Sequence, residues 1–436
     1  MIQFIKTKKH FYFFRLWKSF SFIFLCLIFF LAIFFAFEPI VDKSVKADNL
    51  NYQKTPINKK LGMNDLGWTF DPTYNNDEQF KEGWNYQLSM IKKLPLKYIR
   101  IGTYYSLIKT NTSGNYNFDR LDYAIRTAQN QGLRVIMPIW ADLKITDTYT
   151  GQLAETKDMI TKLVQHEKNK RILWEGIDEA ETGGSFWFGK KMNSRKLHDV
   201  ILTDRYYQYI VKKYDPDSHF ISGDLAGNNH NANYIIRNGI FKPRTNFGSF
   251  HAYENKNPEK VLKDWNAKVI KRLRKNGIKP AITELGYPYP NDFNGHYSRK
   301  QQSDYLLREI FCLDMQGVKV IAPFCMEDTN HQWGLEYSRF SKQKGKMVLA
   351  GKNMQRVFNQ LKGYSFAYRL NSNFRKNGDY VLVYAKTHAP LKYVYWTTKN
   401  ANSQYIGNTK IKLTNSPKIK KIPQIFISWL IKLARN

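Results

Sequence analysis

A regular alternation of short apolar runs and helix-like stretches constrains the fold of this 436-residue chain more than any other feature. Eight runs have the length and apolar character of buried strands, and amphipathic stretches separate them. The runs are residues 60–67, 97–102, 133–140, 171–177, 219–224, 246–251, 279–284 and 318–324. Eight strands alternating with helices over roughly 300 residues is the arrangement of a TIM barrel. The sequence therefore predicts an α/β fold, a (β/α)8 barrel.

Local signals indicate where some of the helices begin and end. Asp119 stands at the start of an amphipathic stretch and is expected to cap its N-terminus. Gly132 follows the same stretch, and Gly277 follows a later one. Glycine is a usual helix stop because it readily adopts the left-handed backbone conformation.

The pattern changes after Gly363. Residues 380–385 and 393–398 are rich in Tyr, Val, Trp and Thr, which favours a small antiparallel β domain packed on the barrel. We expect the catalytic barrel over residues 61–362, the β domain over 363–420 and a basic, apolar tail over 421–436. For that tail a last strand, a buried helix and an interfacial membrane helix all remain open.

The N-terminal region has the pattern of an export signal. Residues 1–18 are basic, and residues 19–37 are apolar without a charge, about the length of a membrane-spanning helix. Residues 45–47 offer the small side chains that a signal peptidase prefers. Residues 1–47 are therefore a cleaved signal peptide or an uncleaved membrane anchor, and 48–60 are expected to be a linker. Both alternatives place the remainder outside the cytoplasm, membrane-anchored or secreted.

The formal net charge of +32 raises the question of nucleic-acid binding. The Lys and Arg residues are spread over the whole chain, so we expect a basic solvated surface, or contact with anionic polymers or lipids, and no nucleic-acid partner.

The chain has three cysteines. Cys26 lies in the N-terminal segment. Cys312 and Cys325 lie in apolar surroundings and are expected to be buried free thiols, with a disulfide between them as the alternative. We expect no metal and no organic cofactor.

Two of the apolar runs end in acids. Asp178 and Glu179 follow run 171–177, and Glu284 ends run 279–284. Ionisable groups at a buried strand end are unfavourable unless they are paired or perform chemistry. In a β/α barrel these ends carry the active site. Two glutamates placed there can supply both carboxyls of a glycosidase.

These strand ends resemble those of glycoside hydrolase clan A. Residues 174–179 read Trp-Glu-Gly-Ile-Asp-Glu and are similar to that clan's Trp-Glu-Gly-x-Asn-Glu, while 282–287 are similar to its second catalytic strand end. Weaker similarities lie at residues 98–100, 118–122, 131–133 and 251–253, and in the C-terminal β segment. The resemblance spans roughly residues 60–400. It implies an exported, cellulase-like retaining β-glycoside hydrolase that acts on a polysaccharide or glycan by double displacement.

The resemblance also implies roles for individual side chains. Glu179 would be the general acid/base and Glu284 the nucleophile. Arg100 would hold Glu284 ionised, and Tyr253 would donate to the same carboxylate. The other expected substrate contacts are His251, which would orient Glu179 or touch the sugar, and the aromatic platforms Trp140 and Phe324. Glu175 is given no catalytic role and is expected to face the barrel wall or pair with a lysine.

The chain departs from the clan pattern at Asp178, where the clan has an asparagine that contacts the sugar's 2-hydroxyl and the nucleophile. An ionised Asp accepts but cannot donate hydrogen bonds, and it would repel Glu284. Asp178 is therefore either protonated or meets a donor on the substrate. Phe324 likewise stands where the clan often has a tryptophan. These departures support one alternative, a catalytically weak glycan-binding barrel that assists polysaccharide assembly or attachment. A second alternative is a structural surface protein that uses its basic face to hold an anionic polymer.

Overall fold

All eight predicted strands are present in the computed structural model. It describes residues 55–65, 76–110, 114–140, 149–182, 191–241, 245–254, 257–289, 297–328, 333–370, 378–406 and 409–421. The strands are β1 (Asn64–Asp65), β2 (Tyr98–Ile101), β4 (Arg134–Trp140), β5 (Leu173–Ile177), β6 (His219–Leu225), β7 (Phe247–Phe250), β8 (Lys279–Ile282) and β9 (Val320–Ile321). A further short strand, β3 (Thr103–Tyr104), pairs with β4.

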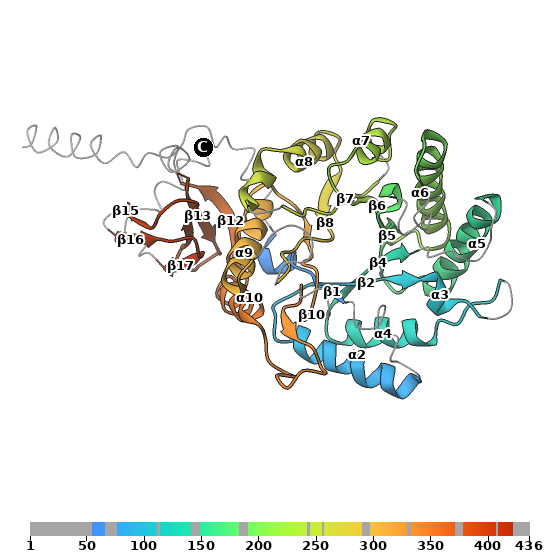
Figure 1. The fold of residues 1–436 in the computed structure, drawn as a ribbon, viewed down its shortest axis with the longest axis horizontal. Coiled ribbons are helices and arrows are strands. Elements are labelled where there is room, and N and C mark those ends of the chain that lie inside the picture. Colours follow the sequence, from blue (N-terminus) through green and yellow to red (C-terminus); the bar gives the residue numbers. More distant parts are fainter. Residues whose placement is uncertain are drawn as a thin grey trace, which may run out of the picture.

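These strands form one parallel sheet in the order β1-β2-β4-β5-β6-β7-β8-β9. A parallel bridge between Leu61 and Ile321 joins its two edges, and the Asn64 N–H donates to the Pro323 carbonyl at 3.0 Å. The sheet therefore curls round on itself, as the strands in Figure 1 show. Because strand order, strand direction and closure all agree, the predicted barrel is confirmed.

Helices follow the strands and lie outside them (Figure 1). Their bounds are α2 (Asp77–Ile91), α3 (Tyr105–Ile108), α4 (Asp119–Asn130), α5 (Tyr149–Glu167), α6 (Ser194–Tyr214), α7 (His230–Arg237), α8 (Trp265–Lys275), α9 (Arg299–Met315) and α10 (Leu349–Gln360). The interior of the barrel is filled by one buried side chain from each of six strands, namely Ile136, Leu173, Ile221, Phe247, Ala281 and Val320. This packing leaves the strand ends as the place for polar groups.

The predicted helix stops are confirmed, and one predicted cap is wrong. Gly132 and Gly277 have φ values of +77° and +73°, the left-handed conformation expected after a helix. Asp119 is the first residue of α4 rather than its cap. The side chain of Asn117 takes the capping role instead, because its Oδ1 accepts the Asp119 N–H at 2.8 Å.

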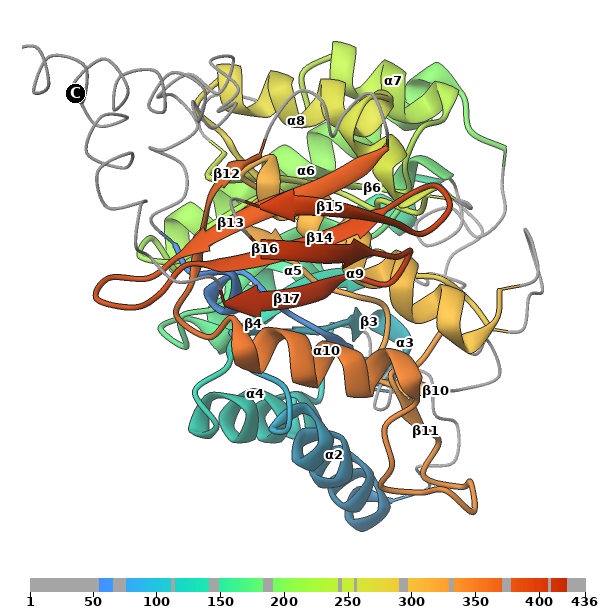
Figure 2. The ribbon, with the colours of Figure 1, turned by 90° about the vertical axis from the view of Figure 1, so that its left-hand side faces the viewer.

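The predicted C-terminal β segment is confirmed as a four-stranded antiparallel sheet in the order β12-β13-β14-β17. Its strands are β12 (Ser365–Arg369), β13 (Asp379–Ala385), β14 (Lys392–Thr397) and β17 (Lys418–Lys421), and β15 (Asn402–Ile406) and β16 (Thr409–Leu413) form a hairpin beside it. Figures 1 and 2 show this sheet lying against α9 and α10. Trp396 is fully buried there, and its Nε1 donates to Glu259 at 2.7 Å. Sheet and barrel therefore share one hydrophobic core.

Several predictions concern the chain ends. The predicted signal or anchor segment (1–47) and residues 422–436 of the predicted tail lie outside the described residues. Within the described ranges, no helix has both the length and the apolar character needed to cross a bilayer. Ile57 and Asn58, inside the predicted linker, are buried, so the packed chain begins before residue 61.

Cys312 and Cys325 are buried free thiols, which confirms the favoured interpretation over a disulfide.

Candidate active site

Charged side chains from five strand ends converge at the C-terminal end of the barrel. Parallel strands point the same way, so residues that end or follow them meet at one mouth. The residues brought together there are Arg100 from β2, Glu175, Asp178 and Glu179 from β5 and the turn after it, Asp224 from β6, His251 and Tyr253 after β7, and Glu284 after β8. All lie within one network of hydrogen bonds. Glu179 stands out because a third of its side chain is exposed, whereas Glu284 is only 7% exposed.

Arg100 is the centre of this network. Its buried guanidinium donates to four carboxyl groups: Glu175 (2.6 Å), Glu284 (2.5 Å), Asp178 (2.5 Å) and Asp224 (2.7 Å). Hydrogen bonds between charged partners are stronger than neutral ones and fix geometry. The predicted contact with Glu284 is present, whereas Glu175 pairs with this arginine rather than with a lysine.

Glu284 receives a donor on each oxygen. Arg100 donates to Oε1, and the Tyr253 hydroxyl donates to Oε2 at 2.7 Å. Burial raises the pKa of Tyr253 well above its usual value, and the neighbouring Glu284 raises it further. The hydroxyl therefore keeps its proton throughout the neutral range. Both donors fix the orientation of the Glu284 carboxylate.

His251 joins the two sides of the site. Its Nδ1 lies 2.6 Å from Glu179 Oε1, and its Nε2 lies 2.8 Å from Asp224 Oδ1. Burial alone lowers the pKa of a histidine, but the charges of Glu284 and Asp224 and these hydrogen bonds raise the pKa of His251 well above its usual value. The raised pKa favours a protonated ring, with one nitrogen directed at Glu179 and the other at Asp224.

Glu179 and Glu284 face each other at short range. One oxygen of each, together with a ring nitrogen of His251, lies within 4.8 Å of the others. Retaining glycosidases hold their two carboxyls about 5–5.5 Å apart, whereas inverting enzymes need about 6.5–9.5 Å to admit a water molecule. Glu179 and Glu284 thus offer two carboxyl groups at short range on the same side of the barrel.

The remaining acids differ in protonation. Burial raises the pKa of Asp178 well above its usual value, because Arg100 offsets only part of that effect and Asp224 and Glu284 add to it. Burial likewise raises the pKa of Glu175 to about 8. The pKa of Asp224 shifts in the opposite direction. Burial raises this pKa, but the charges of Arg100 and His251 lower it by more, and a hydrogen bond from Asp178 lowers it further. The raised pKa of Asp178 favours its protonated form, the first of the two sequence alternatives.

Aromatic rings surround the polar network. Trp140, at the end of β4, is half-buried and packs against Tyr104 with ring centroids 4.6 Å apart. Phe324 is half-buried and lies edge-on to Trp333 at 6.1 Å, and Trp333 lies edge-on to Tyr253 at 5.3 Å. Trp140 and Phe324 thus contribute rings at strand ends, outside the hydrogen-bonded network itself.

Sequence reasoning missed Asp224 and Trp333. Asp224 ends the run 219–224, so the rule that found Glu179 and Glu284 at acid-terminated strands applied to it equally. Trp333 lies in the loop after the eighth strand, between β10 (Glu327–Asp328) and β11 (Glu336–Tyr337). Its position beside Tyr253 depends on how that loop folds back, which no local pattern reveals.

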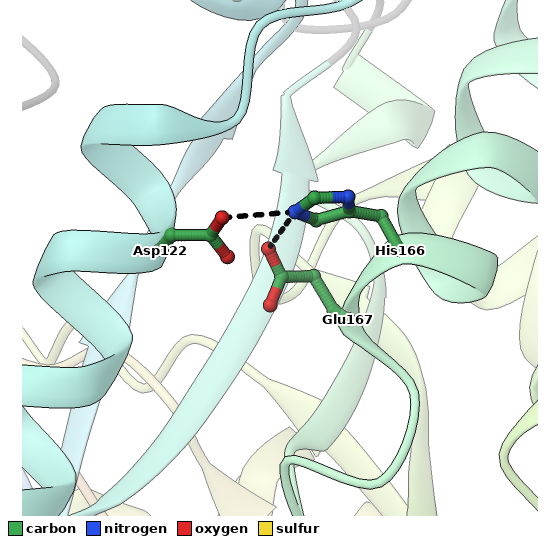
Figure 3. A group of neighbouring side chains, drawn as sticks. All are labelled: Asp122, His166 and Glu167. Atoms are coloured by element: carbon green, nitrogen blue, oxygen red, sulfur yellow. Dashed lines mark hydrogen bonds and ion pairs between the residues drawn. The ribbon is translucent and has the colours of Figure 1, made fainter.

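Among the residues that the structure describes, three groups of acids and histidines have the spacing of metal ligands. Two of them lie inside the site, where both nitrogens of His251 already bond to carboxylates. Figure 3 shows the third, in which His166 Nε2 lies 3.0 Å from Asp122. There the Lys170 ammonium contacts both Asp122 and Glu167, so an internal cation neutralises the group. We assign no metal to any of the three.

Comparison with known proteins agrees with this geometry. Solved structures that this chain resembles include a family 39 glycoside hydrolase from the gut symbiont Bacteroides cellulosilyticus WH2 (14% identity, TM-score 0.63, 87% of this chain and 82% of that one). Another is a glucosidase from Croceicoccus marinus (14%, 0.54, 84% and 82%). A third is a family 5 xyloglucanase from Paenibacillus pabuli (14%, 0.50, 70% and 99%). The fold is that of a barrel glycoside hydrolase.

The resemblance to clan A glycoside hydrolases predicted from the sequence is thus confirmed at the level of the fold. No family profile and no curated protein matches the sequence. Because identity to the solved structures is 14%, they establish the barrel fold alone, and the chemistry of this chain is argued from its own residues.

Proposed function

We propose that the protein is a retaining β-glycoside hydrolase that acts on a polysaccharide or glycan. The observation that carries this proposal is the pair Glu179 and Glu284, whose oxygens face each other within 4.8 Å at the mouth of the barrel. Their surroundings differ as the reaction requires. Glu284 is buried between two donors, whereas Glu179 is partly exposed beside His251.

In the first step, the Glu284 carboxylate attacks the anomeric carbon of the bound sugar. The bond to the leaving oxygen breaks as Glu179 passes a proton to that oxygen, and a glycosyl ester of Glu284 forms. In the second step, Glu179 takes a proton from water, the resulting hydroxide attacks the anomeric carbon, and the Glu284 carboxylate leaves. Both glutamates return to their starting states, and the anomeric configuration is retained.

The protonation of the other acids supports this assignment. Arg100 contacts four carboxyls, and if all were ionised they would compete for its single charge. The raised pKa values of Glu175 and Asp178 favour their neutral forms and so reduce this competition. A neutral Asp178 also removes the repulsion with Glu284 that the sequence raised as an objection. These features favour an active enzyme over the weak glycan-binding alternative.

We also propose that the barrel works outside the cytoplasm. The charge-free run at residues 19–37, with basic residues before it, supports export.

Aromatic rings near the strand ends support a carbohydrate substrate. Trp140, Phe324 and Trp333 offer ring faces there, and aromatic rings bury large apolar area, as a sugar face requires.

The test is a pair of variants assayed on aryl β-glycosides and polysaccharides. Glu284→Gln is expected to fold and lose nearly all turnover, because an amide cannot form the ester intermediate. Glu179→Ala is expected to lose roughly 10²–10⁴-fold on substrates with poor leaving groups and much less on activated aryl glycosides. Azide should restore its turnover and yield a β-glycosyl azide.

Glu82→Gln, on the exposed surface of α2, is the matched control and should match the wild type. Equal turnover in the wild type and both active-site variants would contradict the assignment, and an α-glycosyl azide would contradict double displacement. Glycan binding without turnover on any substrate would instead favour the binding-protein alternative.

A further inference from the structure

A closed ring of hydrogen bonds connects Glu179, Asp224 and His251. The Glu179 N–H donates to the Asp224 carbonyl at 3.0 Å. The Asp224 carboxylate accepts from His251 Nε2 at 2.8 Å, and His251 Nδ1 lies 2.6 Å from the Glu179 carboxylate. Asp224 thus holds Glu179 through two sets of contacts. Its main-chain carbonyl accepts from the Glu179 N–H, and its side chain bonds to His251, which in turn bonds to the Glu179 side chain.

The backbone at this ring is unusual. Glu179 and Asp224 have φ values of +43° and +41°, in the left-handed region that non-glycine residues rarely adopt. Such a conformation is unfavourable and persists only where the surrounding contacts determine it. The two residues that carry this strain are the ones that the ring joins, so the contacts of the ring hold Glu179 in place.

The groups around His251 fix its charge. Besides Glu179 and Asp224, it faces Glu284 at 3.6 Å and Asp178 at 3.9 Å. The ring of Tyr253 lies edge-on to it with centroids 6.3 Å apart. Asp224 in turn accepts from Arg100 at 2.7 Å and from Thr283 at 3.0 Å. A buried carboxylate with this many donors stays ionised, so it is a fixed negative charge beside the imidazole.

We propose that Asp224 is a positioning residue for the hydrolytic reaction, which acts through His251 to keep Glu179 oriented and supplied with its proton. This inference rests on the proposed function. His251 and Glu179 share two protons, one on Nε2 directed at Asp224 and one between Nδ1 and Glu179. The acid step needs this two-proton state, because the second proton is the one transferred to the leaving oxygen. Asp224 favours that state through its charge and thereby sets the alkaline limit of activity.

The test is the pH dependence of kcat/KM in Asp224→Asn. Asparagine has nearly the same size but no charge, so the second proton should leave the pair more readily. The alkaline limb is expected to move down by about one pH unit or more, which means roughly tenfold less activity on that limb. The loss should be smaller for activated aryl glycosides, whose leaving group needs little protonation.

Asp204→Asn is the matched control. Asp204 is also a buried aspartate beside β6, but its carboxylate accepts from Ser222 at 2.5 Å and lies outside the ring. The alkaline limb of the pH profile of Asp204→Asn should lie at the same pH as that of the wild type. A uniform loss in Asp224→Asn with an unmoved limb would show that Asp224 is only structural and would overturn the inference.

A second measurement does not depend on the variant folding. Nitrogen-15 NMR of histidine-labelled protein should show Nε2 of His251, the nitrogen directed at Asp224, protonated at pH 7, with His251→Gln identifying the signal. An unprotonated Nε2 at pH 7 would overturn the inference even if the enzyme is active. Conversely, an inactive wild type with a protonated His251 would count against the proposed function and leave the assignment of charge to Asp224 intact.

Discussion

At the scale of single residues, Asp178 combines a buried position with a raised pKa. Its folded-state pKa lies above its unfolded value, so the folded protein holds this proton more tightly, and that contribution to stability fades as pH rises between the two values. Asp178→Asn should keep the hydrogen bonds to Arg100 and Asp224 without a proton to lose. We therefore expect its melting temperature to rise relative to the wild type as pH increases from 5 to 9, with turnover retained. Exposed Asp217→Asn is the control, and a difference that shrinks with pH would mean that Asp178 is ionised.

The same scale shows what local sequence can predict about a site. Glu179 and Glu284 were predicted as site residues because each lies at the end of an apolar run, where a buried charge is unfavourable unless it is paired or takes part in chemistry. Arg100, His251 and Tyr253 came from resemblance, and the structure shows each in contact with one of the two glutamates. Protonation states could not be predicted, because the state of Asp178 depends on four strands brought together only by the fold.

At the scale of elements, α10 packs tightly against the loop before β11. A Cβ added at Gly351 would lie 2.1 Å from the Leu335 carbonyl oxygen and 2.9 Å from the sulfur of Met347. Gly351→Ala should therefore destabilise the protein by about 1–3 kcal/mol, because overpacking outweighs the roughly 1 kcal/mol gain in helix propensity. Urea unfolding measures this, with the exposed neighbour Lys352→Ala as control. A stabilised Gly351→Ala would mean that the loop yields easily.

Elements were predicted better than their ends. The run 60–67 marked the first strand, yet among its described residues 60–65 only Asn64–Asp65 form β1, because Leu61 makes an isolated bridge to Ile321. Apolar character reports burial, whereas a strand boundary depends on which backbone groups find partners across the sheet. The capping error at Asp119 has the same origin, since Asn117 was the better placed acceptor.

At the scale of the whole molecule, barrel and C-terminal sheet share one core. Trp396 of β14 stacks on Tyr380 at 4.8 Å and lies 6.1 Å from Phe311 of α9. Trp396→Ala should therefore cost about 3–5 kcal/mol and lower the melting temperature of a single cooperative transition. Calorimetry checks this, with Tyr209→Ala, 57% exposed on α6, as control. A second transition that alone shifts would mean that the two parts unfold independently.

Export is also a property of the whole molecule. If residues 1–47 direct the chain across the membrane, the region from Asp48 onward should be cleaved by added protease on intact cells. Full protection until lysis would contradict the proposed location. A cytoplasmic marker protein serves as the control for cell integrity.

One junction in the fold bears on how the molecule would present itself to a polymer. The Ile57 N–H donates to the Tyr364 carbonyl at 2.9 Å, and the Asn58 side chain accepts from the Gly363 N–H at 2.9 Å. This junction precedes β1 and so lies at the N-terminal ends of the strands, whereas Glu179 and Glu284 lie at the opposite ends. Any segment that joins the barrel through Thr55 therefore reaches it at the N-terminal ends of the strands, opposite the mouth. If residues 1–47 anchor the chain, the mouth of the barrel would face away from the anchor and stay open to a long polymer.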